Sequence, residues 1–232
     1  MVILGAQMSN TNKNQFTHLK IHTQYSICEG AVKIVDLKNF CKKNKIHAIG
    51  LSDTKNLCGA LEFAENISKV GTQPIIGSQI NFKFKDQIGI LPIIANNFEG
   101  YKSIIGLSSK SYLENKTTDE PHCLLQELLK IKSGITVLTG SFGGLIGNLF
   151  SKNLLTEIDE VLKLIKNVFE DKFYLEVQRH NDVGEKLFEE FLLKKSNDLA
   201  IPLIATHEVF YLDKDMHEAH DALICIGEKT YV

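Results

Sequence analysis

The chain has 232 residues, of which 44% are hydrophobic and 23% charged, and its formal net charge is −2. A chain of this length can bury one substantial core or two smaller ones. This near-neutral balance excludes an overall basic surface for nucleic acid, so any contact with DNA would have to be local. No segment approaches the roughly 18 apolar residues that a membrane-spanning helix needs, which predicts a soluble globular protein with no membrane association.

The cysteines are irregularly spaced and form no Cys-x-x-Cys pair: Cys28, Cys41, Cys58, Cys123 and Cys225. An odd number of cysteines at such spacing is typical of reduced thiols rather than of a disulfide framework. We therefore expect a cytoplasmic protein whose cysteines act as small hydrophobic side chains.

Short apolar runs typical of strands alternate with amphipathic stretches typical of helices. Residues 1–15 are expected to form a flexible leader, and the pattern begins at Phe16. Strands are predicted at 16–22, 48–51, 74–84, 88–95, 135–138, 173–177 and 203–205. Helices are predicted at 33–45, 57–70, 98–113, 122–132, 157–169, 183–199 and 215–226. The clearest helix is 157–169, where apolar residues recur at i, i+3, i+4 and i+7.

This alternation favours parallel strand pairing, because each crossover needs about a dozen residues and packs its helix on the sheet. Either a doubly wound sheet or a (β/α) barrel fits the pattern. No repeat, low-complexity tract or Pro/Gly-rich linker marks a domain boundary. In both folds the functional side chains gather at the carboxyl ends of the strands.

A polar, histidine-rich set of residues lies at these strand ends. Its members are His18, Lys20, His22, Ser52, Asp53, Gln79, Gln178, His180, His207 and Glu208. Because side chains alternate along a strand, His18, Lys20 and His22 are expected to face the same way. Histidines and carboxylates could together hold metal ions for hydrolysis. The alternative without a functional site is that some of the eight histidines lie near strand ends by chance.

Two other clusters have simple structural explanations. The glycines between Gly140 and Gly147 match neither the G-x-G-x-x-G nor the G-x-x-x-x-G-K-[ST] phosphate motif, and they favour close packing at the start of a following helix. The basic cluster Lys42 to Lys45 ends a predicted helix, where cations complement the helix dipole on a solvated face.

Six stretches of the chain occur in the order of one known family. They are FTHLKIHTQYSICEGAVKIVDL (16–37), AIGLSDTKNLCGALEF (48–63), QPIIGSQINF (73–82), PIIANNFEGYKSIIGLSSKSYLE (92–114), YLEVQRHN (174–181) and PLIATHEVFYL (202–212). This series resembles the PHP domain that opens bacterial DNA polymerase III alpha subunits, and the fourth stretch is particular to the polymerase branch. The resemblance implies a PHP domain over residues 16–232 with an α/β fold, a distorted seven-stranded (β/α) barrel.

The resemblance also implies a metal site in those members that keep activity. The family's His-x-His falls on Lys20 and His22, its Asp-His on Asp53 and Thr54, and its glutamate on Gln79. The next histidine falls on Ile90, the later histidine on His180, and the final Asp-x-His on Glu208 and Phe210. Lys20, Ile90 and Phe210 cannot act as ligands, so a trinuclear metal centre is not expected.

Four remnant metal positions are then left: His22, Asp53, His180 and Glu208. They could hold a single Zn or Mn ion, or they could form a metal-free polar network in which Lys20 supplies the lost positive charge. The network is favoured, because a lysine beside carboxylates balances buried charge without a metal. No catalytic residue and no firmly bound cofactor is therefore expected in this domain.

The resemblance implies a parent chain that is a DNA-directed DNA polymerase, a nucleotidyltransferase of DNA replication. Its catalytic Mg ions would be held in a palm domain beyond Val232, so this fragment alone is not expected to polymerise. The implied partners are the proofreading exonuclease subunit, the remaining polymerase III holoenzyme subunits and, through the parent chain, DNA. Two alternatives stay open: an active metal-dependent phosphoesterase or 3′-5′ exonuclease, and a free-standing regulatory protein built on the same barrel.

Overall fold

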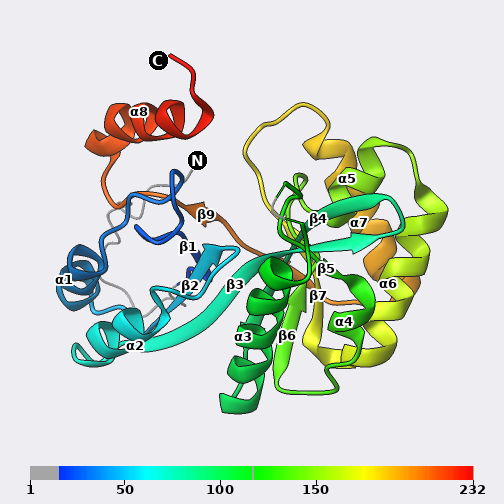
Figure 1. Cartoon of the computed structure of the whole chain (residues 1–232), viewed down its shortest axis with the longest axis horizontal. Helices are drawn as coiled ribbons and strands as arrows, with labels where there is room; N and C mark the ends of the chain where they lie inside the picture. The colour runs from blue at the N-terminus through cyan, green and yellow to red at the C-terminus, as the bar shows by residue number, and fades with distance from the viewer. Residues whose placement is uncertain (1–15, 117, 232) are drawn as a thin grey trace. The chain divides into compact units, whose positions relative to one another are not determined.

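The computed structural model describes residues 16–116 and 118–231, so the predicted leader at 1–15 lies outside the described residues. Contacts between residues divide the chain into two compact units (Figure 1). Unit 1 comprises the chain up to Ile76 together with the chain from His207 onwards, and unit 2 comprises Gly77–Thr206. The boundary between them falls inside one long strand, β3 (Gln73–Phe84).

Unit 1 is built from short parallel strands and helices. Its elements are β1 (Lys20–Ile21), α1 (Ile34–Asn44), β2 (Ala48–Thr54), α2 (Ala60–Ser68), β9 (Glu208–Val209), the 3-10 helix η2 (Lys214–Met216) and α8 (His217–Glu228). β1 pairs in parallel with both β2 and β9: Ile21 lies opposite Leu51 and Val209, and Lys20 lies opposite Glu208. The carboxyl ends of these three strands therefore meet, although β9 is distant in the sequence.

The helices of unit 1 follow their apolar periodicity. Ile34, Leu37 and Cys41 are the buried residues of α1, and they recur along one face of the helix. α1 ends at Asn44, and the next residue, Lys45, adopts the left-handed conformation and donates its backbone N–H to the carbonyl of Cys41. The predicted helix at 33–45 is thus confirmed almost to the residue.

Unit 2 carries a mixed sheet with its helices. After β3 come β4 (Gln87–Ala95), α3 (Phe98–Leu113), β5 (Cys123–Leu124), α4 (Leu125–Leu129), β6 (Ile135–Leu138), α5 (Leu145–Ser151), α6 (Leu155–Phe169), the 3-10 helix η1 (Glu170–Lys172), β7 (Phe173–Val177), α7 (Glu185–Leu199) and β8 (Leu203–Ala205). The strand order is β3-β4-β6-β7-β8, and β5 also pairs with β3. Figure 1 shows α3 to α7 gathered around these strands.

The expectation of parallel pairing throughout is wrong for β4, which runs antiparallel to both β3 and β6. Only Lys85 and Asp86 separate β3 from β4, which is too short for a crossover and suits a hairpin. The later strands β6, β7 and β8 pair in parallel as predicted.

Several predicted boundaries need correction. The strand predicted at 16–22 is hydrogen-bonded as a strand only over Lys20–Ile21. The helix predicted at 122–132 gives the short strand β5 followed by the five-residue helix α4. The helix predicted from residue 183 begins at Glu185, because Gly184 has a φ of +92° that a helix does not accept.

The glycine cluster packs closely, as predicted. A Cβ atom added at Gly147 would lie 1.9 Å from the carbonyl oxygen of Phe142, so only glycine fits there. These glycines lead into and belong to α5, a helix that was not itself predicted. Among the described helices, none has both the length and the apolar composition to cross a membrane.

Candidate functional site

The interior of unit 1 contains an ion-paired cluster at the carboxyl ends of its strands. Lys20 and His22 have exposed fractions of only 1% and 2%. The Lys20 ammonium forms an ion pair with Oε1 of Glu208, and His22 Nε2 lies 2.6 Å from Oε2 of the same carboxylate. Burial alone would raise the pKa of Glu208, but the Lys20 charge and the His22 hydrogen bond outweigh it and hold that pKa well below its usual range.

Asp53, near the end of β2, is fully buried beside this cluster. Its carboxylate accepts the backbone N–H of Thr23 at 2.7 Å, the Thr23 hydroxyl at 2.8 Å and the Ser26 hydroxyl at 2.8 Å. Burial raises the pKa of Asp53, and these hydrogen bonds oppose that shift. Asp53 therefore fixes the loop that follows β1.

The other edge of the His22 ring faces hydroxyl groups. Its Nδ1 lies 3.4 Å from Ser26 Oγ and 3.3 Å from Thr54 Oγ1. Thr54 donates its own hydroxyl hydrogen to Glu29 at 2.5 Å. The face of the His22 ring stacks on Phe210, with 4.4 Å between ring centroids and an interplanar angle of 22°.

Three residues around His22 were not predicted to belong to the site. Ser26 and Glu29 come from the loop after β1, and His220 comes from α8. His220 is buried, lies 5.6 Å from Phe210 between ring centroids, and contacts the Glu29 carbonyl through Nε2 at 2.7 Å. The hydroxyl-bearing and acidic side chains between Thr23 and Glu29, directly after a predicted strand, were the available signal for the loop. Nothing local in the sequence links His220 to it.

His18 lies two residues before β1 and contacts an aromatic ring. Its ring lies edge-on to Phe16 at 4.9 Å between centroids, and burial together with the charge of His207 lowers its pKa to about 4. His18 thus lies in a poorly solvated pocket that disfavours its charged form.

The other positions that the family resemblance picked out lie in unit 2. Gln79 is buried on β3, and Ile90 on β4 forms a bridge with Gly144. His180 follows β7, and its Nε2 lies 3.0 Å from Oε1 of Gln178. The structure thus brings Lys20, His22, Asp53, Thr54, Glu208 and Phe210 together in unit 1 and assigns Gln79, Ile90 and His180 to unit 2.

The loop that carries His180 is fixed by a single carboxylate. Glu185 accepts the backbone N–H of His180 at 2.8 Å and that of Asn181 at 2.8 Å. Gln178, two residues before His180, donates its side-chain amide to Glu176 and to Thr206, both at 2.9 Å. His180 is therefore held by a local hydrogen-bond network.

The donor set does not fit the metal centre that the family resemblance implies for active members. Within residues 16–116 and 118–231, no group of three His, Cys, Asp or Glu side chains is arranged to hold a metal ion. In unit 1, an ammonium, a hydroxyl and a phenyl ring occupy ligand positions at Lys20, Thr54 and Phe210. Metal ligands must offer lone pairs, which the first and the last of these cannot do.

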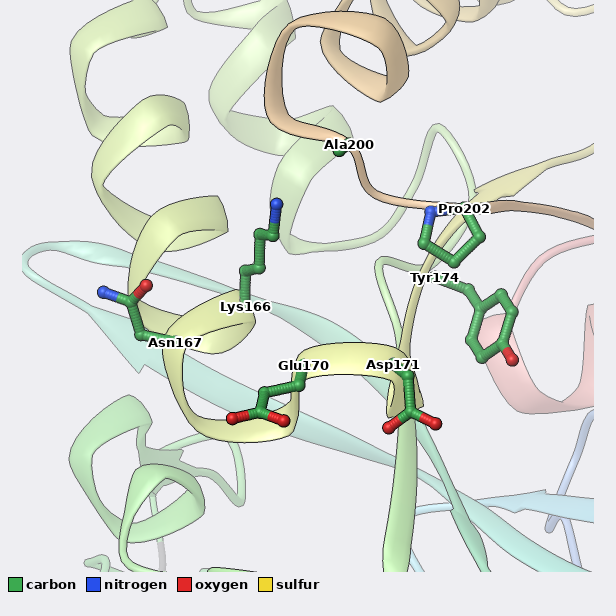
Figure 2. A pocket seen from close by; sticks show the side chains of 7 residues that line it. All are labelled: Lys166, Asn167, Glu170, Asp171, Tyr174, Ala200 and Pro202. Atoms are coloured by element: carbon green, nitrogen blue, oxygen red, sulfur yellow. The ribbon is translucent and has the colours of Figure 1, made fainter.

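A cavity of about 640 Å³ lies elsewhere, at the amino end of β7 in unit 2. It is lined by Lys166, Asn167, Glu170, Asp171, Tyr174, Ala200 and Pro202. Figure 2 shows Lys166 extending towards Ala200, while the carboxylates of Glu170 and Asp171 point away from it. Lys166 donates to the carbonyl of Leu199. These charges do not converge on a common point, and His180 follows the opposite end of the same strand.

The fold is similar to that of solved PHP-like proteins. A protein from Bifidobacterium adolescentis proposed to be a metal-dependent phosphoesterase matches with a TM-score of 0.55 at 11% identity, covering 89% of this chain and 96% of that chain. A two-domain protein from Bacteroides vulgatus that contains a predicted PHP-like metal-dependent phosphoesterase matches with a TM-score of 0.55 at 15% identity. The match covers 93% of this chain and 61% of that chain. These likenesses confirm the predicted α/β fold of the PHP type.

A family model described as the PHP domain matches residues 18–180. The chain therefore belongs to the PHP domain family. The DNA polymerase III subunit alpha of Rickettsia felis is 35% identical, over 92% of this chain and 18% of the relative. That of Borreliella burgdorferi is 33% identical, over 93% of this chain and 20% of the relative. The chain thus spans about a fifth of these relatives and matches their N-terminal region, as the sequence resemblance predicts.

Proposed function

We propose that this chain is the PHP part of a DNA polymerase III alpha subunit and serves there as a structural and subunit-docking module. The parent protein would be a cytoplasmic DNA-directed DNA polymerase that works on DNA with the other polymerase III subunits. Its catalytic Mg ions would be bound by carboxylates of a polymerase domain that this chain does not contain. The names of the relatives and the match to their N-terminal region support this proposal.

The observation that carries the non-hydrolytic role is the ion pair between Lys20 and Glu208. A buried carboxylate needs a compensating positive charge, and in an active PHP site a metal ion would supply it. Here Lys20 is 1% exposed and contacts Glu208 directly, so the protein carries its own cation at a ligand position. A metal entering this position would have to displace that ammonium.

The hydrogen bonds around His22 support the same conclusion. The hydroxyls of Ser26 and Thr54 donate to the carboxylates of Asp53 and Glu29, so their oxygens present lone pairs to His22 Nδ1. His22 Nε2 faces the Glu208 carboxylate. Both ring nitrogens thus already have polar neighbours within the cluster, and a metal ion at either of them would have to displace these contacts.

The hydrolase alternative is tested by measuring cleavage of a chromogenic phosphodiester by the 232-residue chain with added Mn or Zn. We expect background turnover that is the same in the wild type, in His22→Ala and in His180→Ala. Turnover that is present in the wild type and disappears in either variant would assign hydrolysis to this site and reject the structural role.

The docking role is tested separately by mixing the chain with the proofreading exonuclease subunit of the same organism and measuring co-elution by size-exclusion chromatography. We expect a complex that persists in chelator, because no metal is needed to hold the fold. Failure to form a complex at micromolar concentrations would reject the docking role while leaving the metal question untouched.

A further inference from the structure

A dense group of lysines on α1 and at its two ends takes no part in the site described above. Residues 33–45 contain Lys33, Lys38, Lys42, Lys43 and Lys45. Against these five lysines stands one acidic residue, Asp36, which gives the stretch a formal charge of +4 in a chain whose net charge is −2. The overall charge therefore hides a strongly basic segment.

The ends of α1 and α2 lie together in unit 1. The carbonyl of Ile46 accepts the Thr72 hydroxyl at 2.7 Å, and the carbonyl of His47 accepts the backbone N–H of Gln73 at 2.8 Å. These bonds join the residues that follow α1 to those that follow α2, and the two helices contact each other (Figure 1). Lys69, the first residue after α2, therefore lies at the same end of this helix pair as the lysines that end α1.

Lys42, Lys43, Lys45 and Lys69 form what we call the lysine patch. All four side chains are exposed. Throughout the part of the chain that the structure describes, none of them forms an ion pair with a carboxylate. The acidic residue nearest in sequence is Glu65, one turn before Lys69. Like charges gathered without partners repel each other, and the potential they create attracts a polyanion.

We propose that the lysine patch binds the phosphate backbone of duplex DNA. Each exposed ammonium can neutralise one phosphate and release its counterion. Single-strand binders use aromatic side chains as stacking platforms, whereas the one aromatic between residues 33 and 47 is the half-buried Phe40. A protein partner would need apolar or aromatic anchors at the centre of the contact, and the patch consists of lysines.

The choice of DNA rests on the proposed function, since the relatives are polymerase subunits. The hydrolysis and exonuclease experiments leave the lysine patch unchanged, so the two proposals can fail separately. The contact would hold DNA without reading its sequence, because phosphate contacts position a duplex and base contacts specify it.

The test is binding of a fluorescently labelled duplex to the 232-residue chain, followed by anisotropy between about 50 and 200 mM salt. Four phosphate contacts at about −0.9 each predict a slope of about −3.6 for log affinity against log salt. Reversing three charges in Lys42→Glu/Lys43→Glu/Lys45→Glu should reduce the slope to about −0.9 and weaken binding at least about tenfold at the lowest salt. The corresponding glutamine variant, which keeps good helix formers, should give the same reduced slope.

A matched control reverses three exposed lysines on other helices, Lys163→Glu/Lys186→Glu/Lys194→Glu on α6 and α7. It changes the net charge equally, and we expect it to retain the slope of the wild type. Circular dichroism verifies that each variant is folded. Three results would overturn the proposal: no binding by the wild type, an equal loss in the control, or single-stranded DNA bound as tightly as the duplex with the same slope.

Discussion

Unit 1 contains lysines in two opposite environments. Lys20 is 1% exposed and paired with Glu208, whereas the four lysines of the patch are exposed and, within the described residues, have no carboxylate partner. In the interior an unpaired charge is costly, so Lys20 and its carboxylate depend on each other. At the surface, water solvates the charge of a lysine, and this charge can attract an anion from solution. Lysine therefore has a structural role at position 20, whereas the lysines of the patch are available for binding.

The largest effect is expected from Lys20→Met, which removes the ammonium beside the largely buried carboxylate of Glu208. Breaking one partner of a buried pair should lower the free energy of unfolding by about 3–5 kcal/mol, measured by urea denaturation at neutral pH. The double variant Lys20→Met/Glu208→Gln removes both charges and should recover most of that loss. A single-variant loss below about 1 kcal/mol would contradict the dependence of Glu208 on Lys20.

A smaller loss is expected from Asp53→Asn. The amide keeps the shape of the side chain but replaces one acceptor oxygen with a donor that faces the hydroxyls of Thr23 and Ser26. Unmaking these buried hydrogen bonds should cost about 1–3 kcal/mol, again by urea denaturation. Unchanged stability would mean that Asp53 does not hold the loop after β1.

His18 should make the stability of the fold depend on pH. Its pKa is about 4 in the folded protein, below its ordinary value of 6.5, so the unfolded chain binds the proton more readily. Stability from this group is therefore complete above pH 6.5 and falls as the pH drops towards 4. Because His18 is only partly buried, we expect a fall of about 1–2 kcal/mol.

The measurement for His18 compares urea denaturation at pH 7 and pH 4.5 in the wild type and in His18→Gln, which cannot titrate. The difference between the two pH values should shrink in this variant. It should persist in the control His47→Gln, because His47 is exposed. Equal pH dependence in all three proteins would show that His18 is not responsible.

The smallest effect on stability is expected from the triple charge reversal at Lys42, Lys43 and Lys45. These side chains have no ion pair to lose among the described residues, so the free energy of unfolding should change by less than about 0.5 kcal/mol. A loss of unfolding free energy as large as that of Lys20→Met would show that the exposed lysines are as important for stability as the buried one.

Local periodicity predicted the elements that bury one regular face. The helix at 157–169 appears as α6, and its buried residues include Ile158, Val161 and Ile165, because a continuous apolar stripe suits a helix against a core. The hairpin of β3 and β4 could have been foreseen, because only residues 85–87 separate the two predicted strands and a parallel crossover needs about a dozen. The two-residue strand β9 could not, since it exists through pairing with a strand nearly the whole chain away.

The sequence named some of the residues of the unit 1 cluster, but it did not predict their contacts, and it grouped them with His180, which lies in unit 2. The family pattern picked out Lys20, His22, Asp53 and Glu208, and the structure joins the first two directly to Glu208. The role of Glu29 depends on the path of an irregular loop, which hydrophobic periodicity does not describe. Contacts between residues distant in sequence decide the chemistry here, and local patterns do not encode them.

Whether the cluster around Lys20 and Glu208 is free of metal is tested most directly by the metal content of the purified chain. The protein is incubated with excess Zn or Mn, dialysed, and analysed by elemental mass spectrometry beside His22→Ala. We expect metal far below one equivalent in both proteins, because Lys20 already neutralises Glu208. One tightly bound equivalent in the wild type that is absent from His22→Ala would contradict this expectation.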